Sequence, residues 1–237
     1  MQKHTYPNIP GLIFYEDYFS QEECSQLVDR SMTLCQELEV AISDSSKIEK
    51  AHIPQPEFVR SAKHNLASEE FYTRIRLVQS NQRIASCEYF PRYGEDGHAL
   101  CYFRGTSNLP DFVCEGLLDR IGESIQKESF IREGQELTWK LTMNFYKNVG
   151  GTIAGFPFHV DIPANGVVTM ILNIQREVLF QIAKEDFVQD IELPIGSILL
   201  LSGESRYEWK HRVLPRVAGH SETPNKVERV SLVLGFQ

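Results

Sequence analysis

The hydrophobic pattern of this chain changes its period at about residue 138, and this change restricts the possible folds more than any other feature. Before that point apolar residues recur mainly at helical spacing. Beyond it they alternate with polar residues, which predicts half-buried strands. The first such strand alternates Trp139, Leu141, Met143 and Phe145 with Lys140, Thr142, Asn144 and Tyr146. Further strands are predicted at 156–162, 167–174, 178–182, 190–193, 197–202 and 227–236.

The first 137 residues carry mainly helical signals. Ser20 and Glu23 form the capping-box pattern at the start of an amphipathic helix over 21–38, which follows a strand-like apolar run at 11–15. The other predictions here are a loop-rich stretch at 42–66, a short helix at 69–77 and a helix beginning at Pro110. Helices followed by a run of strands predict a mainly β protein of the α+β class, a double-sheet jelly roll with helices packed outside it.

Two histidines and one aspartate in the strand-rich half suggest a metal site. His159 and Asp161 are two residues apart in a predicted strand, so their side chains point to the same side. His211 follows about fifty residues later, just after the strand predicted at 197–202. Two histidines and one carboxylate are the facial triad of non-haem iron, which leaves coordination positions open. The alternative for a lone His-x-Asp pair is ordinary surface hydrogen bonding, and His64, His98 and His220 are expected to be solvated in loops.

Polar residues on two other strands suggest an acid-binding pocket. Arg229 and Ser231 share one face of the last predicted strand, and Asn144 and Tyr146 share the polar face of the first. A buried arginine is costly unless it is paired, and a bound dicarboxylic acid would pair with it bidentately. The alternatives are that Arg229 lies on the solvent face of an edge strand and that Asn144 and Tyr146 lie on the solvent-exposed side of a sheet.

Taken together, these residues resemble the AlkB-like Fe(II)/2-oxoglutarate-dependent dioxygenase family. The matching motifs, in chain order, are Asn144-x-Tyr146, His159-x-Asp161, Phe180-Gln181, Gly203-Glu204-Ser205-Arg206, His211 and Arg229-x-Ser231. The order and spacing of the whole set are more specific than any single member. The resemblance covers 138–237 well, and it continues weakly through 12–29 and the Leu109-Pro110 helix.

The resemblance implies one domain over 1–237, with N-terminal helices and a substrate lid in 1–137 and a double-stranded β-helix (jelly-roll) catalytic core in 138–237. His159, Asp161 and His211 would be the catalytic residues and the ligands of Fe(2+). Arg229, Ser231 and Tyr146 would hold the distal carboxylate of 2-oxoglutarate, and Asn144 would approach the carboxylate nearest the iron. The implied reaction converts 2-oxoglutarate and O₂ to succinate and CO₂ while a substrate C–H bond is hydroxylated; an N-alkyl carbon is then released as an aldehyde.

One position departs from the family pattern. The family usually has a second arginine six residues after the first, on the same strand face, and here that position is Gly235. Lys140 or Arg212 is a candidate to supply the missing cation. The loss also keeps open a catalytically weak binding module with the same fold.

The resemblance implies a nucleic-acid substrate, since family members commonly demethylate N-alkylated bases. Such enzymes hold the extruded base between aromatic rings. Tyr102, Phe103 and Phe156 are the candidate substrate contacts. A hydroxylase or demethylase of a protein or small molecule is the alternative, mildly favoured by 24 basic against 32 acidic residues and a net charge of −8.

Other features concern the environment of the protein. The five cysteines are scattered without a C-x-x-C pair, which is typical of buried free thiols. No leader-like segment and no apolar run of membrane-spanning length is present in the sequence. We therefore expect a cytoplasmic or nuclear protein with no membrane partner, and a monomer.

Overall fold

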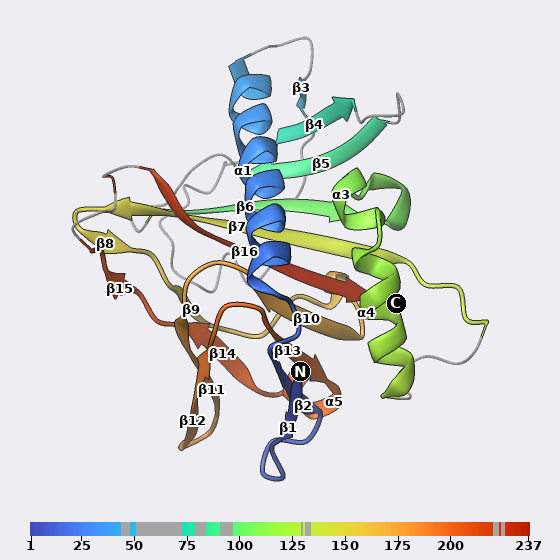
Figure 1. The fold of residues 1–237 in the computed structure, drawn as a ribbon, viewed down its shortest axis with the longest axis vertical. Coiled ribbons are helices and arrows are strands. Elements are labelled where there is room, and N and C mark those ends of the chain that lie inside the picture. The colour runs from blue at the N-terminus through green and yellow to red at the C-terminus, as the bar shows by residue number, and fades with distance from the viewer. Residues whose placement is uncertain are drawn as a thin grey trace.

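A computed structural model of the chain describes residues 1–43, 48–50, 73–78, 84–90, 97–128, 130, 134–219, 223 and 226–237. Within these residues the strands form two antiparallel sheets (Figure 1). The large sheet has the order β1 (Gln2–Thr5), β2 (Leu12–Glu16), β13 (Ser197–Ser202), β10 (Val168–Asn173), β16 (Val227–Phe236), β7 (Trp139–Val149), β6 (His98–Arg104), β5 (Ile84–Phe90), β4 (Thr73–Val78) and β3 (Ile48–Lys50). The small sheet has the order β12 (Phe187–Leu193), β11 (Val178–Lys184), β14 (Lys210–Val213) and β9 (Phe156–His159). At one end β8 (Thr152–Ile153) pairs with both β7 and β15 (Arg216–Val217).

Eight strands of the C-terminal half pass back and forth between the two sheets. Strands β7, β10, β13 and β16 lie in the large sheet, and β9, β11, β12 and β14 lie in the small one. Their spatial orders are β13-β10-β16-β7 and β12-β11-β14-β9. This is the arrangement of a double-stranded β-helix, so the predicted jelly roll is confirmed.

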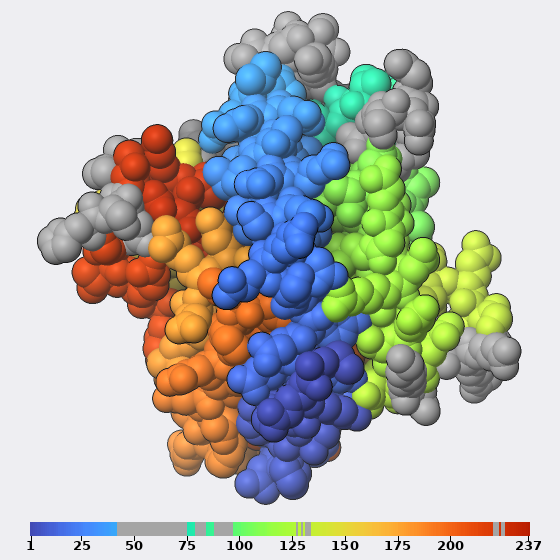
Figure 2. Space-filling view, in the orientation of Figure 1, coloured from blue at the N-terminus to red at the C-terminus, as the bar shows by residue number. Residues whose placement is uncertain are grey.

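The helices cover the face of the large sheet that points away from the small sheet. These are α1 (Gln21–Ser43), α3 (Asp111–Cys114) and α4 (Leu117–Lys127), which lie side by side on the face shown in Figure 2. Leu38 of α1 and Ile121 of α4 belong to one apolar core with Met143 and Leu232 of the sheet. Glu23 of α1 also pairs with Arg120 of α4. The helices thus pack on the outer face of the large sheet, opposite the small sheet.

A second, smaller core lies between the two sheets. It contains Leu12, Phe14, Ile171, Leu199 and Leu201 from the large sheet and Phe180, Ile182, Ile191 and Leu193 from the small sheet. Strand β10 supplies both cores, because its alternate residues point to opposite faces. The double burial explains why β10 and β13 read as nearly continuous apolar runs.

Local chemistry explains the helix limits. The capping box of α1 is present: the backbone N–H of Glu23 donates to Ser20 Oγ, and the backbone N–H of Ser20 donates to Glu23 Oε2. The predicted helix after Pro110 is divided into α3 and α4 at Gly116, which has a left-handed φ of 89°. Two short elements, η1 (Thr106–Asn108) and η2 (Pro163–Asn165), and the helix α5 (Gly203–Tyr207) complete the described fold.

Some predictions for the first half were wrong or lie outside the described residues. The short helix predicted at 69–77 is wrong for its described part, where β4 pairs with β5. In β4 the side chains of Ile75 and Leu77 are buried while those of Arg76 and Val78 are exposed, a period of two. Most of the loop predicted at 42–66 lies outside the described residues, as do His64 and His220.

Among the described helices, none is both long and apolar enough to cross a membrane.

Candidate metal centre and its pocket

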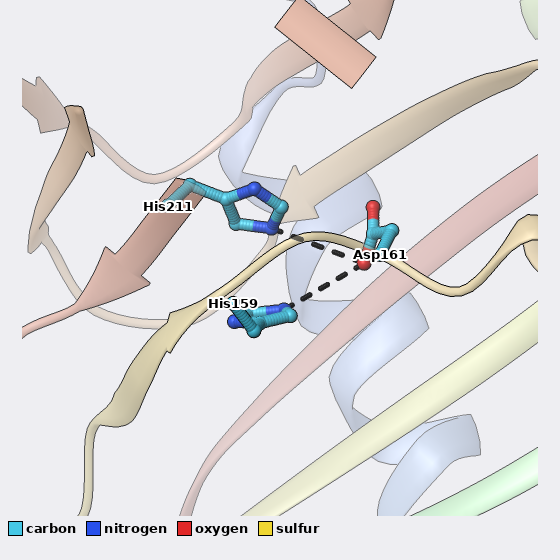
Figure 3. Close-up of side chains that lie close together, drawn as sticks. All are labelled: His159, Asp161 and His211. Atoms are coloured by element: carbon cyan, nitrogen blue, oxygen red, sulfur yellow. Dashed lines mark ion pairs between the residues drawn. The ribbon is translucent and has the colours of Figure 1, made fainter. Parts of the chain in front are cut away.

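His159, Asp161 and His211 meet between the two sheets. Their ligand atoms all lie within 4.8 Å of one another, and the described residues contain no other such group of three (Figure 3). The Nε2 atoms of His159 and His211 lie 3.7 and 3.8 Å from the same atom, Asp161 Oδ1. The pairing of β9 with β14 brings the two histidines directly opposite each other. A divalent metal between these three atoms would have two imidazoles and one carboxylate as ligands.

The structure corrects how these residues come together. The spacing argument placed His159 and Asp161 on one strand, but β9 ends at His159, and Asp161 lies in the turn before η2. His211 does not directly follow the strand at 197–202, because α5 intervenes and His211 lies on β14. The convergence therefore depends on pairing across the small sheet and on the turn after β9.

The electrostatics hold Asp161 and His211 in the protonation states that bind metal. Burial would raise the pKa of Asp161, but the neighbouring His159 and His211 and the guanidinium of Arg206 hold that pKa well below its usual range. Burial and the neighbouring His159 lower the pKa of His211 to about 3. An ionised carboxylate and a neutral imidazole are the forms that coordinate a metal ion.

Neighbouring groups fix the orientation of two of the three side chains. The His159 Nδ1 atom lies 2.8 Å from the Pro157 carbonyl oxygen, so this nitrogen donates and Nε2 keeps its lone pair. Thr169 Oγ1 donates to Asp161 Oδ2 at 2.9 Å, which leaves Oδ1 facing the histidines. The guanidinium of Arg206 donates to the carbonyl oxygens of Asp161 and Ile162 at 2.7 and 2.6 Å. The turn after β9 is thereby held against α5.

The large sheet provides the other wall of the cavity next to the three side chains. The register of β7 and β16 places Tyr146 opposite Arg229 and Asn144 opposite Ser231, and all four line the cavity. The register of β6 places His98 beside Tyr146. The cavity has an empty volume of about 530 Å³, part of which is open to solvent. The residues predicted to bind 2-oxoglutarate therefore share one cavity with His159, Asp161 and His211.

Arg229 is the most informative residue of this wall. It is 2% exposed, and β16 lies between β10 and β7, so the alternative of an exposed edge strand does not hold. None of its three guanidinium nitrogens has a hydrogen-bond partner among the described residues. Its guanidinium carbon lies 4.5 Å from the centre of the Tyr146 ring. A cation–π contact offsets only part of the cost of burying a cation, so this pocket fits an anionic ligand.

No protein-family model matches the chain, and no curated protein matches its sequence. Among solved structures, OsALKBH1 is similar with a TM-score of 0.49 and 12% identity, covering 95% of this chain and 97% of that one. A prolyl-4-hydroxylase from Pseudomonas putida has a TM-score of 0.49 and 14% identity, with 96% and 92% covered. IDO from Bacillus thuringiensis has a TM-score of 0.43 and 16% identity, with 61% and 79% covered.

The double-stranded β-helix that the resemblance implies is established by the strand order of the two sheets.

The candidate substrate contacts separate into two groups. Tyr102 and Phe156 are buried and line the cavity. Phe103 points to the opposite face of β6 and is fully buried in the core between the large sheet and the helices. Because successive residues of a strand face opposite sides, Tyr102 and Phe103 cannot both reach the cavity. Phe103 therefore has a packing role in this structure.

The space expected for the missing arginine is filled by backbone. A Cβ atom added to Gly235 would lie 1.8 Å from the carbonyl oxygen of Asn165 and 3.0 Å from that of Val168. Asn165 belongs to η2 and lines the cavity. The absence of a side chain at 235 is therefore a packing requirement of the turn after β9.

The two candidate substitutes for that arginine do not line the cavity. Lys140 donates from Nζ to Gln237 Oε1 at 2.8 Å, at the end of β7. Arg212 donates from Nε to Gln181 Oε1 at 2.6 Å, and its guanidinium carbon lies 4.4 Å from the centre of the Phe158 ring. Among the described residues that line the cavity, Arg229 has the only guanidinium or ammonium group.

Three residues of the site were not identified as such in the sequence. Thr169 is a polar residue inside an apolar strand, which is a signal for a buried hydrogen bond. Arg206 belongs to the Gly-Glu-Ser-Arg motif, which predicted membership of the family but not its contact with the turn after β9. His98 was expected to be solvated, and this is wrong, since it is 5% exposed on β6. Its alternation with Leu100 and Tyr102 could have indicated a strand.

Proposed function

We propose that this protein is an Fe(II)- and 2-oxoglutarate-dependent dioxygenase. The observation that carries the proposal is one cavity that combines two histidines and an aspartate at one side with a buried, unpartnered arginine on the opposing wall. The facial set of nitrogen and oxygen donors fits iron, with room for further ligands. The orphaned guanidinium fits a carboxylate.

Each group has a defined part in this proposal. His159, Asp161 and His211 would hold the metal, and Arg229, with Ser231 and Tyr146, would hold the distal carboxylate of 2-oxoglutarate. When bound, iron and 2-oxoglutarate supply the oxidising chemistry, in which O₂ and 2-oxoglutarate yield succinate, CO₂ and a hydroxylated substrate.

In this proposal the residues of the chain bind the metal and the co-substrate, orient the metal-binding side chains and keep water out of the cavity. Thr169 and the Pro157 carbonyl oxygen keep Asp161 and His159 in the orientation required of ligands. The apolar residues of the core between the sheets, such as Ile171, Phe180 and Val213, limit access of water to the cavity. A dry cavity strengthens the pairing of Arg229 with a carboxylate.

For the substrate, we propose an N-alkylated base in nucleic acid, which would be demethylated. Tyr102 lines the cavity, and the guanidinium carbon of Arg104 lies 5.2 Å from the centre of its ring. Lys140 is opposite Arg104 in the register of β6 and β7. Burial and the charge of Arg104 lower the pKa of Lys140. Two neighbouring cations beside an aromatic ring suit a ligand with a planar base and a phosphate.

The test measures succinate formed from 2-oxoglutarate by the purified protein with Fe(II) and O₂. We expect succinate with the wild-type protein and none with His159→Ala. A protein that binds 2-oxoglutarate but forms no succinate would instead be a binding module. A single-stranded oligonucleotide with N-methylated bases should stimulate turnover and release formaldehyde. Stimulation by methylated peptides or small molecules alone would replace the nucleic-acid proposal with a protein or small-molecule oxygenase.

A further inference from the structure

His98 lies on the cavity-facing side of β6, next to residues that line the cavity, and aromatic rings contact it from two sides. It is 5% exposed and stands opposite Tyr146 in the pairing of β6 with β7. Its ring stacks on that of Tyr146, with centroids 4.7 Å apart and an interplanar angle of 14°. The ring of Phe156 meets it edge-on at 4.6 Å. Both aromatic neighbours line the cavity, so the plane of the imidazole is fixed by the same residues that form the pocket.

The imidazole makes a hydrogen bond to a residue of the pocket. His98 Nε2 lies 3.1 Å from Asn144 Oδ1. Because an amide oxygen can only accept, Nε2 must be the donor, and His98 must carry a proton on this nitrogen. The carbonyl end of the Asn144 amide is then engaged on the side of β6. No described residue accepts a hydrogen bond from its Nδ2, and Asn144 lines the cavity.

The direction of this amide matters for an acidic ligand. The two ends of an asparagine amide have nearly the same size but opposite hydrogen-bonding character. An oxygen presented to a carboxylate would repel it, whereas an N–H₂ group would donate to it. Asn144 is directly opposite Ser231 and two residues from Tyr146, and all three line the same cavity as Arg229.

We propose that His98 is a positioning residue that keeps the Asn144 amide nitrogen directed into the cavity, where it donates to a carboxylate of the co-substrate. This inference rests on the proposed function, because that function supplies 2-oxoglutarate as the acid. It assigns a role to a histidine that is not among the residues that line the cavity. It also gives the cavity a neutral donor of fixed direction in addition to Arg229.

The experiment measures 2-oxoglutarate binding by calorimetry, with Mn(II) as an inert replacement for Fe(II). His98→Phe keeps the ring packing against Tyr146 and Phe156 but removes the donor, and we expect affinity to fall about tenfold. His98→Gln keeps an amide N–H at a similar reach and should retain most of the affinity. In an Asn144→Ala background, His98→Phe should have no further effect, because the group that it positions is gone. Mn(II) affinity should be equal in all these variants.

The outcomes separate this inference from the proposed function. If the wild-type protein with Mn(II) binds no 2-oxoglutarate, the proposed function fails. If the wild-type protein binds it and His98→Phe binds it equally well, or if His98→Phe weakens binding equally with and without Asn144, the inference is overturned. The ¹⁵N chemical shifts of His98 provide a separate test without ligand. They should show the Nε2-protonated form, and the Nδ1-protonated form would contradict the assignment.

Discussion

Two arginines, Arg206 and Arg229, are among the most deeply buried side chains of this protein, and their surroundings differ. Arg206 is 1% exposed and donates to two backbone carbonyl oxygens, at 2.7 and 2.6 Å. Arg229 is 2% exposed and has no hydrogen-bond partner among the described residues. The first arginine has its ligand within the protein, namely the turn that carries Asp161. The second fits a ligand from outside. Burial of an arginine therefore indicates function only after its partners are counted.

The largest effect is expected for Arg206→Met. The substitution leaves the carbonyl oxygens of Asp161 and Ile162 buried without donors, at a cost of about 1–3 kcal/mol each. We expect the free energy of unfolding of the metal-free protein to fall by about 3 kcal/mol, measured by urea denaturation. Unchanged stability would show that the turn after β9 does not need this arginine.

The matched substitution Arg229→Met should act in opposite directions on stability and binding. It removes an unpaired buried charge, so the ligand-free protein should become more stable, by about 1 kcal/mol or more. Hydrogen bonds to charged groups contribute about 1.5–3 kcal/mol, so 2-oxoglutarate affinity should fall at least about tenfold. Calorimetry and urea denaturation measure the two effects. A loss of stability similar to that of Arg206→Met would mean that Arg229 is a structural residue.

The two ends of β16 provide the next test. At one end, the guanidinium of Arg229 has no hydrogen-bond partner among the described residues. At the other end, the backbone of η2 fills the space beside Gly235. Gly235→Ala should lower the free energy of unfolding by about 1–3 kcal/mol through overpacking. Gly235→Arg should not increase 2-oxoglutarate affinity. If Gly235→Arg folds well and binds the acid more tightly, the glycine is a simple loss and the packing explanation is wrong.

The smallest expected effect concerns Thr169. The isosteric change Thr169→Val removes the hydrogen bond to Asp161 Oδ2 and leaves the core volume nearly unchanged. We expect Fe(II) affinity to fall about tenfold, because partners of metal-binding carboxylates tune affinity by that order. Anaerobic titration measures it. Equal affinity would show that Asp161 is oriented by Arg206 and the backbone alone.

The sequence was sufficient to predict the parts that depend on local periodicity. The alternation that begins at Trp139, the capping box at Ser20 and the apolar runs of β10 and β13 are properties of neighbouring residues, and the structure agrees with them. The sequence does not show whether Arg229 on the last strand faces the interior or the solvent. Only the pairing of β16 with both β10 and β7 buries this side chain. The role of Gly235 required the position of Asn165, seventy residues away in the chain.

The β-strands of the first half were harder to predict. The sequence does not predict strands β5 and β6, and the helix that it predicts at 69–77 is a strand, β4, in its described part, because aromatic and polar residues obscure the period of these strands. For the same reason the sequence predicts that His98 is solvated. The burial of His98 follows from the pairing of β6 with β7, which its neighbours in sequence do not indicate. Long-range pairing, unlike periodicity, is only weakly encoded in any short segment.

The central claim is that His159, Asp161 and His211 bind one metal ion together. Anaerobic titration of the metal-free protein with Fe(II) tests it most directly. The wild-type protein should bind one ion per chain, and His159→Ala, with unchanged stability of the metal-free form, should lose this binding. Tight binding of one Fe(II) by both His159→Ala and His211→Ala would contradict the account.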